Sequence, residues 1–145
     1  MIITICSSAF FAKESFDIKK KLEDRGHTVF IYPEEIKIDD KIIHVTDFYN
    51  MRKNNLTNDL VNVKSVLIKE HFKNIENSDA ILVLNFDRDG EEGYVGGNTF
   101  LEMGVAYYLN KKIFLWKFPM KKLPYFEEIL SMNPRIIDGD IDKIK

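Results

Sequence analysis

Asp79-Ala-Ile-Leu-Val-Leu-Asn-Phe-Asp87 begins the stretch of sequence that decides the fold. It is followed by Arg88-Asp-Gly-Glu-Glu-Gly-Tyr-Val-Gly-Gly-Asn-Thr99 and by Phe100-Leu-Glu-Met-Gly-Val-Ala-Tyr-Tyr-Leu109. The residues from Ala80 to Phe86 are nearly all apolar, which is typical of a central parallel strand buried on both faces. The three parts therefore predict a strand, a glycine-rich loop and a helix in succession.

The loop of this stretch is unusually rich in glycine, with Gly90, Gly93, Gly96 and Gly97. Glycines let the backbone adopt positive φ and approach a ligand closely. Ligands of open α/β sheets bind in the crevice beyond the carboxyl ends of the strands, and this loop follows such an end. Asn98 or Thr99 is predicted to cap the next helix, with Glu102 in its first turn.

The flanking segments continue the alternation of strand and helix. Further strands are predicted at Ile2–Cys6, Thr28–Tyr32, Ile113–Trp116 and Arg135–Asp138. Helices are predicted around Phe11–Leu22, Val63–Asn77 and Tyr125–Met132. We therefore expect one domain over residues 1–145. Its fold class is α/β, a three-layer sandwich with an open sheet of about five parallel strands, of flavodoxin- or Rossmann-like type.

Residues 34–62 do not follow this alternation. They are rich in Lys, Asp and Asn and show no single hydrophobic period, apart from a short amphipathic helix within Val45–Arg52. Long connections beside a crevice often close over a ligand. We expect an irregular insertion at 34–62 that acts as a lid.

The composition is that of an ordinary globular protein. The chain has 145 residues, a formal net charge of −2 and one cysteine. This charge argues against a nucleic-acid partner, and no apolar run is long enough for a membrane span. One cysteine cannot form an internal disulfide, and no signal peptide is evident, so we expect a cytoplasmic protein. No Cys/His cluster of metal-binding spacing is present, so we expect no metal and no cofactor.

Several of these motifs resemble the nucleoside 2-deoxyribosyltransferase family. The family has a strand opening with Asp, as at Asp79, then a glycine loop and a helix that begins with Glu-hydrophobic-Gly, as at Glu102-Met-Gly104. Ile5-Cys-Ser-Ser8 resembles the Cys-Gly-Ser opening of relatives, and Arg25-Gly-His-Thr-Val29 before the second strand also matches. The resemblance covers most of the chain outside residues 34–62.

The resemblance implies cleavage of the N-glycosidic bond of a nucleoside or nucleoside 5'-monophosphate. A carboxylate at Glu102 would attack the anomeric carbon, as in retaining glycosidases. It also implies a homo-oligomer, because relatives complete their sites with neighbouring subunits. The candidate substrate-binding residues are Cys6, Ser7, Ser8, Asn85, Asp89, Tyr94, Gly96, Gly97 and Asn98. Ser7 and Ser8 stand before a helix, where they could contact a phosphate or a sugar hydroxyl.

The family's usual acids are replaced in this chain. Relatives have an aspartate six residues before the nucleophile, where this chain has Gly96. They have another aspartate on the preceding helix, where this chain has His71. The candidates to assist the leaving base are therefore Asp87, Asp89 and His71, and we take Glu102, Asp87 and His71 as the catalytic set.

Three alternatives remain at this point. Thr99-Phe-Leu-Glu102 fits a capping box, in which Glu at the third helical position bonds back to the capping residue. The Gly96-Gly-Asn-Thr-Phe-Leu-Glu102 spacing differs by one residue from the Gly-Gly-x-Gly-Thr-x-x-Glu motif of cytokinin-activating phosphoribohydrolases. A nucleotide-sensing module without turnover is the third.

Overall fold

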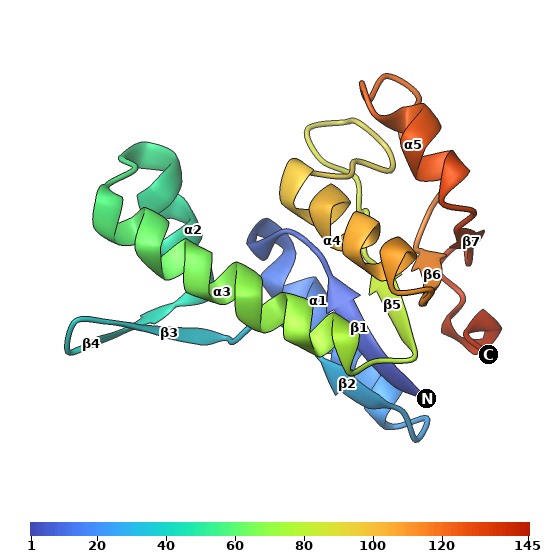
Figure 1. The fold of residues 1–145 in the computed structure, drawn as a ribbon, viewed down its shortest axis with the longest axis horizontal. Coiled ribbons are helices and arrows are strands. Elements are labelled where there is room, and N and C mark those ends of the chain that lie inside the picture. The colour runs from blue at the N-terminus through green and yellow to red at the C-terminus, as the bar shows by residue number, and fades with distance from the viewer.

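The computed structural model describes residues 1–145, and its centre is a parallel sheet of five strands (Figure 1). The strands lie in the order β2 (Thr28–Phe30), β1 (Ile2–Cys6), β5 (Ala80–Val83), β6 (Lys112–Leu115) and β7 (Arg135–Ile136). Every neighbouring pair is parallel. Counted within this sheet alone, the order is the flavodoxin-like 2-1-3-4-5. The predicted five-stranded parallel sheet is confirmed.

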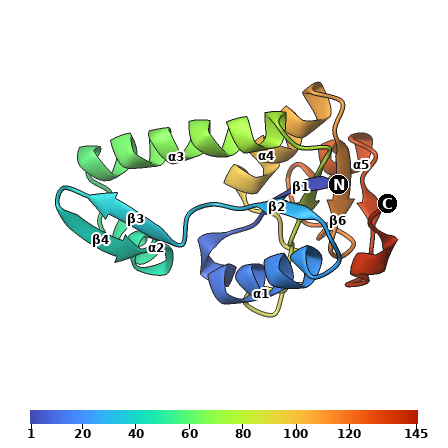
Figure 2. The ribbon, with the colours of Figure 1, turned by 90° about the horizontal axis from the view of Figure 1, so that it is seen from below.

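Helices cover both faces of the sheet (Figure 2). Helix α1 (Ala12–Glu23) covers one face, and α3 (Asn58–Glu76), α4 (Gly97–Tyr108) and α5 (Phe126–Ser131) pack on the other. The short helices η1 (Ala9–Phe11) and η2 (Ile141–Lys143) complete the fold. No helix combines the length and the apolar character needed to cross a membrane.

The organising strand β5 is buried on both sides, as its composition predicts. Ala80 and Leu82 belong to the core beneath α1, whereas Ile81 and Val83 belong to the core beneath α3 and α4. All four side chains have no exposed surface. Because successive side chains of a strand point to opposite faces, only an unbroken apolar run can serve both cores.

The prediction that residues 34–62 are irregular is wrong. They form an antiparallel hairpin of β3 (Glu35–Ile38) and β4 (Lys41–His44), then α2 (Val45–Asn54), and α3 begins at Asn58 rather than Val63. Figure 1 shows the hairpin beside α2 and the first turns of α3. The segment buries Ile36, Val45, Phe48 and Leu60 in a small core that it shares with Ala12 of α1. Closure of this segment over a ligand stays a prediction.

Helix α4 begins earlier than predicted, and this removes the capping box. Its N-cap is Gly96, in extended conformation, and its first residue is Gly97. Glu102 therefore lies in the second turn, and Thr99 is buried inside the helix. The Glu102 carboxyl accepts a hydrogen bond from the Asn98 side chain and none from the N-cap amide. Val95, the residue before this N-cap, is buried in the core and holds the end of the loop there.

Candidate active site

A cleft of about 310 Å³ opens at the carboxyl ends of β1 and β5. In a sheet of this order, the connections from these two strands leave toward opposite faces, which creates a crevice between them. Ser7 and Ser8 follow β1 on one side of the cleft, and Gly96 and Gly97 close the glycine loop on the other. The loop thus lies at the crevice, where its sequence placed it.

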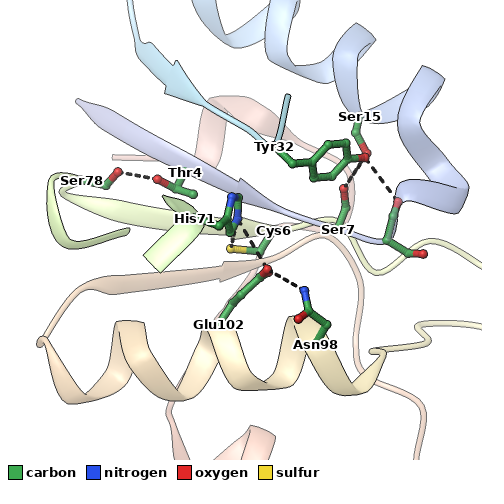
Figure 3. Close-up of polar contacts among 10 residues, drawn as sticks. Thr4, Cys6, Ser7, Ser15, Tyr32, His71, Ser78, Asn98 and Glu102 are labelled. Carbon is green, nitrogen blue, oxygen red and sulfur yellow. Dashed lines mark hydrogen bonds and ion pairs between the residues drawn. The ribbon is translucent and has the colours of Figure 1, made fainter. Parts of the chain in front are cut away.

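Three buried side chains meet at the inner end of this cleft (Figure 3). Cys6 ends β1, His71 lies on α3 and Glu102 lies on α4. His71 Nε2 stands 3.7 Å from Glu102 Oε1 and 3.7 Å from Cys6 Sγ. Asn98 Nδ2 donates a hydrogen bond of 3.0 Å to the same Glu102 oxygen. Glu102 Oε2 is buried and has no hydrogen-bond partner within the protein.

The Glu102 carboxyl is held in its protonated form by its surroundings. Burial raises the pKa of Glu102 to about 8, although Cys6, Lys64 and Asn98 each act to lower it. Burial, followed by the charge of Lys64, lowers the pKa of His71 to about 4. The two groups are at ion-pair distance, yet both pKa values favour neutral forms. The exposed fractions of the two side chains are 6% and 7%. In so dry a pocket a neutral acid and a neutral imidazole are favoured over separated charges.

The same three side chains are the one group in the structure with metal-ligand geometry. Their ligating atoms all lie within 4.8 Å of one another. Cys, His and Glu suit a four-coordinate zinc ion with one open position. A metal requires the thiolate, however, and burial raises the pKa of the Cys6 thiol well above its usual range. The structure therefore favours a protonated thiol beneath the carboxyl group.

Most of the predicted site residues line the cleft. These are Ser7, Ser8, His71, Tyr94, Gly96, Gly97, Asn98 and Glu102. Cys6 is fully buried and lies behind His71. Asn85 is also buried, and its side chain holds the backbone of Lys117, accepting from the Lys117 N–H at 3.0 Å and donating to its carbonyl at 2.9 Å. Neither Cys6 nor Asn85 lines the cleft.

The structure places Asp87 and Asp89 outside the cleft. The Asp87 carboxylate is exposed and pairs with Lys117 Nζ at 2.9 Å, which lowers the pKa of Asp87. It also accepts a hydrogen bond from the Gly93 amide at 3.4 Å, so its role here is to fasten the loop. Asp89 is exposed in a turn, with a φ of 51°. Neither carboxylate reaches the Glu102 end of the site, which leaves His71 beside it.

Among the other residues that line the cleft, five have polar or charged side chains that the sequence did not single out: Tyr32, Tyr49, Arg52, Lys64 and Arg88. Lys64 had a signal, because Lys64 and His71 are two helical turns apart and share one face of α3. Tyr49 and Arg52 had none, because α2 reaches the cleft through long-range packing against the hairpin, η1 and α1.

No family model matches the chain, and no curated protein matches it. Among solved structures, it is similar to the CMP N-glycosidase of Clostridium botulinum, at a TM-score of 0.50 and 16% identity over 94% of this chain and 87% of that one. It is also similar to the 2-deoxyribosyltransferase of Bacillus psychrosaccharolyticus, at a TM-score of 0.44 and 21% identity over 79% of this chain and 71% of that one.

The fold and the site define an α/β protein with a buried carboxyl group at the crevice of a flavodoxin-like sheet. The chain shares this fold with the CMP N-glycosidase. This is the fold that the resemblance to the nucleoside 2-deoxyribosyltransferase family predicts.

Proposed function

We propose that the protein cleaves the N-glycosidic bond of a nucleoside or nucleoside 5'-monophosphate, with Glu102 as the attacking carboxylate. The observation that carries this proposal is the buried Glu102 carboxyl, which lines the cleft beside His71 and has one oxygen without a partner. A structural role does not require an acid in so dry a position, where its pKa rises to about 8.

One proton serves the pair of Glu102 and His71. Transfer of the carboxyl proton to His71 Nε2, 3.7 Å away, gives a carboxylate and an imidazolium. The carboxylate attacks the anomeric carbon, forming the glycosyl-enzyme as the bond to the base breaks. The proton held by His71 is then available to the leaving base. Water or a second base releases the sugar, giving hydrolysis or transfer.

The direct test is incubation with a panel of nucleosides and nucleoside 5'-monophosphates, followed by chromatography. Free base without added acceptor indicates a hydrolase, and a newly formed nucleoside in the presence of a second base indicates a transferase. Base release from monophosphates alone would show that the phosphate is part of the recognised substrate. Binding without release of base would contradict the proposed reaction and favour a sensor.

We expect this activity to be independent of metal. The Cys6 thiol is buried and protonated, so a metal at this cluster would have to displace its proton and occupy Glu102. Dialysis against a chelator should leave base release unchanged, and metal analysis of the protein should show no stoichiometric ion. Added zinc should inhibit by binding the carboxylate. Loss of activity on chelation, restored by a metal ion, would contradict the carboxylate mechanism.

We also propose that the protein is a cytoplasmic homo-oligomer that associates through α4. Leu101, Tyr107 and Tyr108 of this helix are 56%, 55% and 83% exposed, so apolar area remains uncovered. Met103 of the same helix is fully buried and takes no part in this surface.

Sedimentation should show an oligomer at micromolar concentration, and Tyr108→Glu should shift it toward monomer, because a charge would be buried at the contact. Ile42→Glu is a suitable control. Ile42 is 70% exposed on the hairpin, away from α4. A monomer in the unmodified protein would contradict the proposal.

A further inference from the structure

We propose that Arg52, Lys64 and Arg88 form an anion subsite that binds the phosphate of a nucleotide, so that phosphorylated nucleosides, and not free nucleosides, are the substrate class. The inference deepens the proposed function and rests on it for the nucleoside part. All three residues line the cleft that contains Glu102. They come from three separate elements, α2, α3 and the glycine loop.

The three cations have no carboxylate partner. None of them takes part in an ion pair within the protein, although four of the chain's other lysines do. Arg52 Nε is buried without a hydrogen-bond partner. A buried donor that lacks a partner costs free energy unless a ligand supplies the acceptor. The cleft therefore holds three cations, one of them with a buried unpaired donor, for which the chain supplies no anionic partner.

These cations also lie close enough to repel one another. Burial, and then the charge of Arg52, lowers the pKa of Lys64. The guanidinium carbons of Arg52 and Arg88 lie 5.8 and 5.9 Å from the centre of the same Tyr49 ring. The Tyr49 hydroxyl accepts a hydrogen bond of 2.6 Å from Arg88 Nη2. Like charges gathered around one aromatic ring favour binding of a multiply charged anion, for which the fork of arginine is well suited.

The hydroxyls of the Ser7-Ser8 turn, where the sequence suggested a phosphate contact, already form hydrogen bonds within the protein. Ser7 Oγ lies 2.7 Å from Ser15 Oγ and 3.4 Å from the Tyr32 hydroxyl. Ser8 Oγ accepts the Phe10 amide as the cap of η1, a helix of only three residues. These hydroxyls position the turn, and the cations of the cleft are the better partners for a phosphate.

The placement of the cations suits a phosphate linked to the reacting sugar. Lys64 precedes His71 by two turns of α3, which is about 10 Å along the helix axis. Leu67 and Ile68 line the cleft between them. A sugar can therefore occupy the space over these apolar side chains, with its anomeric carbon toward Glu102 and its phosphate toward Lys64.

The test measures binding in the Glu102→Gln background, so that no substrate is consumed. Titration calorimetry compares cytidine with CMP and adenosine with AMP, with inorganic phosphate as a competitor. We expect each monophosphate to bind at least about tenfold more tightly than its nucleoside, because charge-assisted hydrogen bonds to phosphate are strong. Arg52→Gln combined with Lys64→Gln should abolish this preference and leave nucleoside binding unchanged. Inorganic phosphate should weaken monophosphate binding only when both cations are present.

Lys69→Gln combined with Lys73→Gln is the matched control, because both lysines are exposed on α3 and neither lines the cleft. This control variant loses the same two positive charges and should still bind monophosphates more tightly than nucleosides. Arg52→Lys, which retains the charge, should keep part of it and guards against misfolding of the double variant. Equal binding of nucleosides and monophosphates would overturn the subsite, as would an unchanged preference in the double variant. Since no turnover is involved, this outcome is distinct from a failure of Glu102 to act in catalysis.

Discussion

Replacing Glu102 by glutamine is expected to lower base release by about a thousandfold or more. The amide keeps the shape of the carboxyl group and the acceptor for Asn98 Nδ2, which donates at 3.0 Å. It cannot attack the anomeric carbon or offset the positive charge of an oxocarbenium-like transition state. Nucleotide binding should survive, so the loss should fall on kcat more than on KM.

The control for this variant is Glu70→Gln, which removes an exposed carboxylate from α3 and should leave turnover unchanged. Circular dichroism and the melting temperature should show an intact fold in both variants. If Glu102→Gln keeps most of the turnover, Glu102 is a structural residue and the proposed mechanism is wrong. A nucleotide panel that shows base release in the unmodified protein is the starting point for the comparison.

The same substitution is expected to make the protein more stable at alkaline pH. The pKa of Glu102 rises from 4.5 to about 8 on folding, so the folded state holds a proton that the unfolded state releases. This contribution is fully present below pH 4.5 and is lost as the pH rises toward 8. The pKa of His71 falls from 6.5 to about 4, so its contribution is lost in the opposite direction, as the pH falls from 6.5 to 4.

Between pH 4.5 and 6.5 the effects of Glu102 and His71 on the free energy of unfolding have opposite slopes against pH and cancel. Above pH 6.5 only the effect of Glu102 remains. Between pH 6.5 and 8 the free energy of unfolding should therefore fall by about 2 kcal/mol, at 1.36 kcal/mol per pH unit. This corresponds to a melting temperature lower by roughly 5 °C. Glutamine does not titrate, so Glu102→Gln should show no such fall.

Thermal denaturation at a series of pH values, at constant ionic strength, measures this difference. Glu70→Gln should follow the unmodified protein throughout, because its carboxylate is exposed. If the melting temperatures of Glu102→Gln and of the unmodified protein change in parallel between pH 6.5 and 8, the Glu102 carboxyl ionises freely. The buried neutral acid would then be the wrong description of the site.

The sequence by itself determined the sheet and the place of the cleft. The run from Ala80 to Val83 can satisfy two cores only as a central strand, and the structure places it there with no exposed surface. The alternation of strands and helices then predicts that the strands are parallel and that a crevice lies beside the glycine loop. The resemblance singled out Glu102. These conclusions depend on local patterns, which neighbours in sequence are enough to specify.

Only the tertiary structure decided which side chains share the cleft with Glu102. Cys6 and His71 are 65 residues apart in the chain, and Arg88 and Tyr49 are 39 apart, so no local spacing joins them. Asp87 follows the same strand as the loop, yet its pairing with Lys117 directs it outward. Arg52 reaches the cleft on α2, because Phe48 of that helix is buried together with Ile36 of the hairpin and Ala12 of α1. Sequence periodicity does not encode these contacts between segments. The chemistry of the site is therefore a product of long-range packing, because packing sets both the neighbours and the burial that shift each pKa.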